Sequence, residues 1–164
     1  MNFEALYRWA VMQASDGDLF LEIGTYKGRS AAYMMHRILQ SGKDIGFITV
    51  DPFDGSGDKY SKYPREIYQD FSQGIKALGI KVVHLVGRSQ DLAPYLADGS
   101  LAFVFVDGSH DYQDVKADLE AYLPKVKPGG ILAGHDLQYQ DVKRAVKPYK
   151  YEVWKNCYLI KSGG

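Results

Sequence analysis

The chain has 164 residues, of which 46% are apolar, and its 20 basic residues balance its 20 acidic ones. This length and apolar content predict one domain with a real core and argue against disorder. The charge balance argues against nucleic acid and anionic membranes as partners. Cys157 is the single cysteine, so no intramolecular disulfide forms, and it is expected to be a packed core thiol. No stretch resembles a signal peptide or a membrane span, so a cytoplasmic protein is expected.

Apolar periodicity predicts an alternation of helices and strands along the chain. Residues 2–14 have helical spacing, and Leu19 to Ile23 is a short apolar run typical of a buried parallel strand. A turn from Gly24 to Gly28 leads into a helix over 29–39. Further strands are expected at 47–50, 81–86, 101–106 and 131–133, and further helices at 65–78, 91–96, 115–123 and 141–146. Residues 149–153 and 158–161 are expected to form a closing hairpin.

This alternation predicts an α/β fold of the Rossmann-like, doubly wound kind. Its sheet is expected to be mostly parallel, with helices on both faces and an antiparallel edge made by the closing hairpin. The expected single domain spans residues 1–164, and no internal repeat divides it. Residues 54–64 are polar and rich in glycine and tyrosine, which makes them a candidate lid loop.

The turn after the first strand is a candidate ligand site. Its pattern is G-x-x-x-G and not G-x-G-x-x-G, which argues against NAD or FAD. By its spacing the turn is as often a plain strand-to-helix connection as a ligand site. Glu22 lies inside the apolar strand, where a carboxylate is costly to bury without a partner. We therefore expect Glu22 to accept hydrogen bonds from the N–H groups of the loop or from a cationic ligand.

Every predicted parallel strand ends in polar residues. Each such residue has a structural explanation as a helix cap or a turn residue. In a parallel sheet, however, these ends meet at one edge, where ligands bind. Together they predict one ligand crevice, formed by Gly24, Thr25 and Tyr26, by Asp51, by Ser89 and Gln90, by Asp107 with His110, and by His135 and Asp136. His36 and His84 lie within elements and are expected to be structural.

Particular chemistry follows from three of these strand ends. A carboxylate at Asp51 can accept both hydroxyls of a ribose. Asp107, His135 and Asp136 can together hold a divalent cation. Mainly oxygen ligands suit Mg²⁺, Mn²⁺ or Ca²⁺, and the imidazole favours Mn²⁺ or a softer metal. His110 lies three residues after Asp107, within reach of a group at that cation as a general base.

Several motifs in this chain resemble one enzyme family. Leu21 to Ser30 (LEIGTYKGRS) resembles the first motif of class I S-adenosylmethionine-dependent methyltransferases. Residues 86–96 (VGRSQDLAPYL) are similar to the corresponding stretch of catechol O-methyltransferase. Residues 106–112 (VDGSHDY), 127–130 (KPGG) and 134–136 (GHD) resemble a small bacterial and phage branch that includes macrocin-type sugar O-methyltransferases and cephalosporin-hydroxylase-like proteins. The resemblance extends from Leu19 to Asp136.

The resemblance implies a role for each matched residue. The methionine part of S-adenosylmethionine would lie among Glu22, Gly24, Thr25, Tyr26, Gly28 and Ser30. Asp51 and Pro52 would lie at the ribose, Ser89 and Gln90 would flank the adenine, and Asp107 would contribute to both the cofactor and the metal site. Asp107, His135 and Asp136 fall where metal-dependent relatives keep Mg²⁺ ligands, although relatives carry two acids or Asp-Asn at the last pair. His110 stands where catechol O-methyltransferase has a lysine base.

The expected activity is metal-assisted O-methylation of a small hydroxylated acceptor such as a sugar, a phenol or another metabolite. One alternative is a module that binds S-adenosylmethionine without transferring its methyl group, and another is a different enzyme on the same scaffold. A nucleic-acid methyltransferase is disfavoured, because the charge is balanced and no Asn/Asp-Pro-Pro-aromatic motif occurs. The methyl acceptor is expected to be selected by residues 54–64, Gln138 and Tyr139. The N-terminal segment is short, so a second subunit that completes the acceptor pocket in a homo-oligomer stays an open alternative.

Overall fold

The structure is a computed structural model that describes residues 3–54, 64–77 and 82–163. The first half of the chain forms α1 (Phe3–Gln13), β1 (Leu19–Ile23), α2 (Arg29–Ser41), β2 (Gly46–Asp51), α3 (Pro64–Ala77) and β3 (Val83–Val86). The second half forms α4 (Ser89–Leu92), η1 (Ala93–Tyr95), β4 (Leu101–Val106), α5 (Tyr112–Tyr122), η2 (Leu123–Lys125), β5 (Val126–Gly134), α6 (Gln140–Val146), β6 (Tyr151–Trp154) and β7 (Cys157–Lys161).

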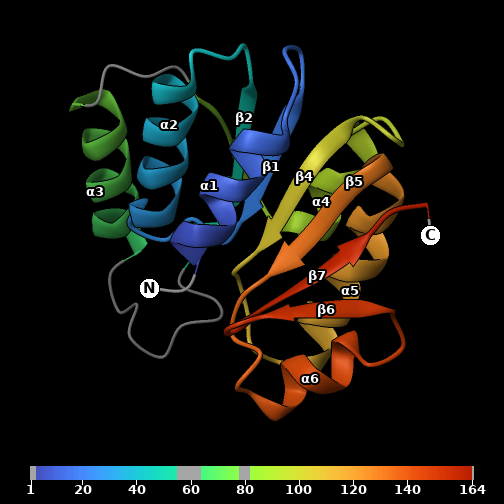
Figure 1. Cartoon of the computed structure of the whole chain (residues 1–164). Helices are drawn as coiled ribbons and strands as arrows, with labels where there is room; N and C mark the ends of the chain where they lie inside the picture. The colour runs from blue at the N-terminus through green and yellow to red at the C-terminus, as the bar shows by residue number, and fades with distance from the viewer. Residues whose placement is uncertain (1–2, 55–63, 78–81, 164) are drawn as a thin grey trace.

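The described strands form one twisted sheet in the order β3-β2-β1-β4-β5-β7-β6 (Figure 1). The strands β1 to β5 pair in parallel, whereas β7 runs antiparallel to β5 and β6 antiparallel to β7. The chain starts in the middle of the sheet and moves outward to β3, then returns to β4 and continues to the other edge. The predicted Rossmann-like α/β fold with a closing antiparallel hairpin is confirmed.

The two faces of the sheet carry separate hydrophobic clusters, because successive side chains of a strand point to opposite faces. Phe103 and Phe105 of β4 belong to the cluster beneath α1, α2 and α3. Val104 and Val106 of the same strand belong to the cluster beneath α5 and α6. Cys157 is fully buried in the first cluster, as its sequence context predicts. Figure 1 shows these two helical layers on either side of the sheet.

The turn between α1 and β1 is held by charged side chains. Lys43 Nζ donates to the carbonyl oxygens of Val11, Met12 and Ala14 at 2.8, 2.9 and 2.6 Å. These carbonyls lie at and just beyond the end of α1, where a helix has no internal donors left to offer. A lysine there also matches the negative end of the helix dipole. Lys43 therefore fixes the position of α1 against the sheet.

Some predicted boundaries were wrong for identifiable reasons. The strand predicted at 131–133 is longer: β5 begins at Val126 and carries a register shift against β4. Asp51 is the last residue of β2 and not the residue after it, because its neighbour β3 extends the pairing to Asp51. The helix predicted over 91–96 is divided into α4 and η1, with Pro94 in the 3-10 turn.

The predicted lid falls almost entirely on residues 55–63, outside the described residues, and stays a prediction. Within the described part of the chain, no helix is long and apolar enough to cross a membrane.

Candidate functional site

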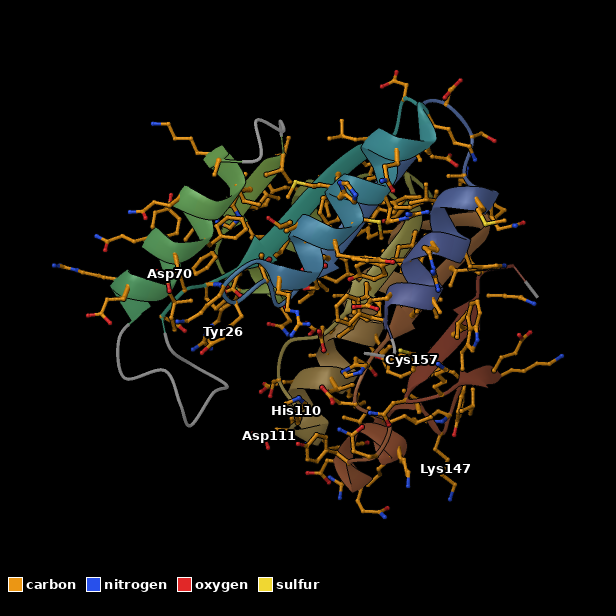
Figure 2. The ribbon with its side chains drawn as sticks, turned by 60° about the vertical axis from the view of Figure 1, so that its left-hand side comes forward. Tyr26, Asp70, His110, Asp111, Lys147 and Cys157 are labelled. Carbon is orange, nitrogen blue, oxygen red and sulfur yellow. The ribbon has the colours of Figure 1, made fainter. Side chains whose placement is uncertain are left out.

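The carboxyl ends of the parallel strands are joined to one another by backbone hydrogen bonds. Gly24 N–H donates to the Val50 carbonyl at 2.9 Å, Asp107 N–H to the Ile23 carbonyl at 2.8 Å, and His135 N–H to the Val106 carbonyl at 3.1 Å. The residues that follow β1, β4 and β5 are thus locked side by side, and we call this line the strand-end edge. We call the ends of β1, β2 and β3 its cofactor side and the ends of β4 and β5 its acceptor side, after the roles that the sequence predicts for them. In Figure 2, Tyr26 lies beside α3 and its Asp70, whereas His110 and Asp111 lie by the start of α5.

The two glycines of the first loop are required by contacts within the protein. Gly24 has φ 85°, and a Cβ there would lie 2.3 Å from the carbonyl oxygen of Asp107. Gly28 has φ 84°, and a Cβ there would lie 2.7 Å from the ring of Phe71. Positive φ and close approach both favour glycine. The close packing of β1 against β4 and α3 therefore explains these glycines without a ligand.

Asp51 organises the loop that follows β1. Its Oδ2 accepts hydrogen bonds from the N–H groups of Thr25 and Tyr26, both at 2.8 Å, and its Oδ1 accepts one from Phe53 N–H at 2.8 Å. The prediction that Glu22 receives the N–H groups of this loop was wrong, because Asp51 on the neighbouring strand receives them. Each carboxylate oxygen has more than one lone-pair site. Asp51 can therefore hold the loop and still accept hydroxyl groups from a ligand.

Glu22 is fully buried beneath the loop, with neutral donors on both carboxyl oxygens. Tyr7 Oη of α1 donates to Oε2 at 2.6 Å, and Ser30 Oγ of α2 donates to Oε1 at 2.9 Å. Burial raises the pKa of Glu22 to about 8, against the lowering effect of these two hydrogen bonds. Glu22 thus connects α1, β1 and α2 behind the loop.

Unfavourable backbone conformations occur along the strand-end edge. Tyr26, Phe53 and Asp136 follow β1, β2 and β5 and have φ values of 47°, 47° and 60°. Residues other than glycine rarely adopt positive φ, and such strain gathers at functional sites. Thr25 Oγ1 is also buried without a hydrogen-bond partner among the described residues. Strain and an unpaired polar atom at one loop are features of a ligand site.

Ser89 and Gln90, at the start of α4, are held by an acid from α5. Asp118 is buried, with 4% of its surface exposed, and accepts hydrogen bonds from Ser89 Oγ and from Gln90 Nε2, the latter at 2.6 Å. Tyr122 Oη, one helical turn further on, donates to the carbonyl oxygen of Ser89 at 2.9 Å. Burial raises the pKa of Asp118 to about 6.

The acceptor side carries a cluster of acids and histidines. His135 Nδ1 lies 3.5 Å from Asp107 Oδ1 and 3.2 Å from Asp136 Oδ1. Hydrogen bonds to Asp107 and Asp136 raise the pKa of His135 to about 10. Burial raises the pKa of Asp107. For Asp136, the hydrogen bonds from His135 and Gln138 outweigh burial and lower the pKa to about 2. The imidazolium of His135 therefore balances the two acids in the structure as it stands.

His110 reaches the same cluster from the loop before α5. Its Nε2 lies 2.7 Å from Asp136 Oδ2, and its ring stacks on Tyr139 with the centroids 4.6 Å apart. Gln138 Nε2 donates to the other oxygen of Asp136 at 2.7 Å. His110 remains 44% exposed, so its ring can still meet a molecule from solvent.

The cluster has the donors and the spacing for a cation. Single ligand atoms from Asp107, His135 and Asp136 all lie within 4.8 Å of one another. A cavity of about 10 Å³, lined by these residues with His110 and Tyr158, lies beside them. A space of that size holds one water-sized particle. Two carboxylates and one imidazole suit Mn²⁺ or a similar ion, provided that His135 gives up its proton.

A wider groove opens at the other end of the edge. It has a volume of about 360 Å³ and lies between the residues that follow β2, the end of β3 and the first turns of α3. Pro52, predicted to lie at the cofactor, forms part of its wall with Phe53 and Val86. His84 packs behind this groove against Phe53 and Phe71, and its Nδ1 lies 2.8 Å from Thr49 Oγ1, which fits the structural role expected of it.

Comparison with known proteins agrees with this architecture. A methyltransferase domain family matches residues 21–137. An uncharacterised protein, R132, of Acanthamoeba polyphaga mimivirus is 28% identical over 186 residues, covering 99% of this chain and 78% of the viral protein. The O-methyltransferase NovP superposes with a TM-score of 0.74 at 19% identity, covering 98% of this chain and 79% of NovP. TomG of Streptomyces achromogenes, an O-methyltransferase of tomaymycin synthesis solved with S-adenosylmethionine, gives 0.70 at 16%, with 98% and 79% covered.

The fold and this match define the class of protein. The chain belongs to the methyltransferase domain family. It is a class I S-adenosylmethionine-dependent methyltransferase, as its motifs predict.

Tyr7 and Asp118 contribute to the candidate site but were not identified from the sequence. Tyr7 lies on the apolar face of α1 with Phe3 and Leu6, and nothing in the sequence pairs it with Glu22. Asp118 carries a detectable signal, since it lies between Val115, Leu119 and Tyr122 on the buried face of α5. An acid on an apolar helix face requires a buried partner.

Proposed function

We propose that this methyltransferase is an O-methyltransferase that uses His110 as its general base and acts on a small hydroxylated molecule. The observation that carries the proposal is the contact between His110 and Asp136 at the acceptor side, with the ring still 44% exposed. A sugar, a phenol or another small metabolite with a hydroxyl group fits this chemistry. The similarity to the O-methyltransferases NovP and TomG supports the same choice.

The cofactor is proposed to lie along the strand-end edge. Thr25, Tyr26 and Gly28 of the first loop would hold its methionine part, with Gly24, Glu22 and Ser30 supporting them from behind. Asp51 and Pro52 would lie at the ribose, and Ser89 and Gln90 at the adenine. The unpaired Thr25 Oγ1 supports a ligand at this loop. The sulfonium would then lie near the junction of β1 and β4, beside Asp107.

The hydrogen bond to Asp136 determines which nitrogen of His110 acts as the base. An ionised carboxylate only accepts, so Nε2 carries the hydrogen and donates it to Asp136. The low pKa of Asp136 keeps its carboxylate ionised. Nδ1 is therefore the nitrogen with the free lone pair, and it takes the proton from the acceptor hydroxyl. The methyl sulfonium is already activated, so the remaining task is to align the hydroxyl oxygen with the methyl carbon at about 3 Å.

A divalent cation would be held by Asp107, His135 Nδ1 and Asp136. A bound cation of this kind orients the acceptor oxygens and lowers the pKa of the hydroxyl. Two residues of the chain position the base: Asp136 orients His110, and Tyr139 packs against the face of its ring.

Calorimetry with S-adenosylhomocysteine, followed by methyl transfer to a panel of sugars and phenols with and without Mn²⁺, tests the proposal. His110→Ala is expected to lower turnover by about 10²- to 10⁴-fold while cofactor affinity stays unchanged. His36→Ala, at an exposed histidine of α2, is the matched control and is expected to leave both unchanged.

Cofactor binding without turnover on any acceptor would favour the alternative of a binding module. Turnover that survives His110→Ala would remove the proposed base. Turnover that depends on neither Mn²⁺ nor Mg²⁺ would leave the imidazolium of His135 as the cation of the cluster.

A further inference from the structure

Asp118 has no place in the proposed chemistry, yet it is among the most constrained polar residues of the chain. It is one of the few buried charged residues in the described part of the protein, and it lies on α5, on the face of the sheet opposite α1 and α2. Its partners are the side chains of Ser89 and Gln90, the first two residues of α4. We therefore asked what a buried acid accomplishes at that place.

The order of the strands decides which part of the cofactor faces α4. The methionine end belongs to the loop after β1, and Asp51 at the end of β2 is the ribose acceptor. The next strand outward is β3. The base is attached to the ribose on the side away from the methionine, so it extends toward the end of β3, where Ser89 and Gln90 begin α4. This step rests on the proposed function, since it requires S-adenosylmethionine to lie along the strand-end edge.

The carboxylate of Asp118 allows the side-chain amide of Gln90 only one orientation. A carboxylate has no hydrogen to donate, so the group of Gln90 that faces it must be the NH₂ group, as the contact of 2.6 Å between Nε2 and Oδ1 records. The orientation of the amide thus follows from the chemistry of the carboxylate. The carbonyl Oε1, at the other end of the amide plane, then points away from Asp118 as an acceptor.

We propose that Asp118 is a positioning residue that fixes the Gln90 amide with its carbonyl toward the cofactor base, so that the site selects a 6-aminopurine over a 6-oxopurine. The amino group of adenine donates to a carbonyl oxygen, whereas the oxo group of hypoxanthine presents a second acceptor to it. A site built to pair with one hydrogen-bonding group rejects the analogue that lacks it. Tyr122 assists by anchoring the Ser89 carbonyl from the next turn of α5.

The test compares two ligands by calorimetry on the full chain: S-adenosylhomocysteine and its deaminated analogue, S-inosylhomocysteine. The wild-type protein is expected to bind the adenine compound at least about tenfold more tightly. In Asp118→Leu the oxygen that accepts from Gln90 Nε2 is lost, so the amide of Gln90 can turn either Oε1 or Nε2 to the base. The preference is expected to fall to about one.

Asp114→Leu is the matched control, because it makes the same replacement at an exposed position in the first turn of the same helix. It is expected to keep the wild-type preference. The double variant Asp118→Leu with Gln90→Glu gives position 90 a carboxylate with two acceptor oxygens, so an acceptor faces the base whichever way the group turns. It is expected to restore the preference for adenine, which a merely structural role of Asp118 would not do.

A preference for adenine that is unchanged in Asp118→Leu overturns the inference. Failure of the wild-type protein to bind S-adenosylhomocysteine overturns the proposed function instead, so the two failures are distinguishable. If Asp118→Leu does not fold, nuclear magnetic resonance on the wild-type protein still tests the inference. Side-chain NH₂ signals of Gln90 that respond to the ionisation of Asp118 support the contact, and signals that behave as those of a solvent-exposed amide contradict it.

Discussion

The two sides of the strand-end edge balance their acids in different ways. On the cofactor side, Glu22 and Asp118 are held by neutral donors from tyrosine, serine and glutamine side chains, and Asp51 by backbone N–H groups. On the acceptor side, the imidazolium of His135 balances Asp107 and Asp136, and His110 and Gln138 make further contacts with Asp136. Neutral donors fix geometry without depending on salt or on a second charge, whereas a histidine cluster responds to protons and cations. The cofactor side is thus organised by folding itself, and the acceptor side remains open to control by solution conditions.

The largest expected effect lies where the two sides meet, at Gly24. Gly24→Ala combines positive φ with a Cβ 2.3 Å from the Asp107 carbonyl oxygen, and it is expected to lower the free energy of unfolding by about 3 kcal/mol or more. Gly17→Ala is the control, since Gly17 has the same φ of 85° with nothing within 4 Å of the added Cβ. Urea denaturation measures both. Equal losses would mean that backbone strain, and not contact with β4, governs Gly24.

The second prediction tests the neutral donors of the cofactor side. Tyr7→Phe leaves one oxygen of the buried Glu22 carboxyl without its donor, and this is expected to cost about 2 kcal/mol of unfolding free energy. Tyr33→Phe, at a ring that packs edge-on against Phe3 in the same layer, is the matched control and is expected to cost much less. A loss in Tyr7→Phe no greater than in the control would show that the contact with Glu22 contributes nothing.

The third prediction concerns the pH dependence of that carboxyl. The folded-state pKa of Glu22 is raised from 4.5 to about 8, so between these values the folded protein holds a proton that the unfolded chain has lost. Stability therefore falls as pH rises through this window. The unfolding free energy of wild type minus that of Glu22→Gln is expected to fall by up to about 1.4 kcal/mol per pH unit there. Denaturation at several pH values measures it, and a constant difference would show that Glu22 is ionised throughout.

The smallest effect is expected on the acceptor side. Free Mn²⁺ at about three times its dissociation constant is expected to raise the unfolding free energy by about 0.8 kcal/mol. Because the pKa of His135 is about 10, binding at neutral pH is expected to release about one proton per ion, which calorimetry in buffers of different ionisation enthalpy detects. His135→Gln should remove the proton release. Binding of Mn²⁺ without proton release would place the ion elsewhere.

Much of the architecture could be predicted from the sequence, because it depends on patterns that are local in the chain. The apolar runs at Leu19–Ile23 and Leu101–Val106 became strands β1 and β4 with the predicted ends. Polar residues after those strands identified the strand-end edge, since parallel strands bring their carboxyl ends together. The predicted ends of strands were wrong where pairing with a neighbouring strand determines them, as at Asp51 and at the start of β5.

The hydrogen-bond partners of each acid could not be predicted from local patterns. The sequence assigned the N–H groups of the glycine loop to Glu22, two residues away from Gly24, but they bind Asp51 from the next strand. Tyr7 and Asp118 were overlooked because their partners lie 15 and 28 residues or more away along the chain. The lid predicted over 54–64 and the roles of the individual site residues remain predictions.

The sequence by itself determined the alternation of strands and helices, the class of enzyme and the polar residues at the ends of the strands, because each of these depends on residue type and short spacing. Only the tertiary structure decided which hydrogen-bond donors each acid receives. Side-chain hydrogen bonds form between elements that folding brings together, and a carboxylate takes whichever donors lie within about 3 Å of it. For this protein, that difference separates a cofactor side built on neutral donors from an acceptor side built on charge.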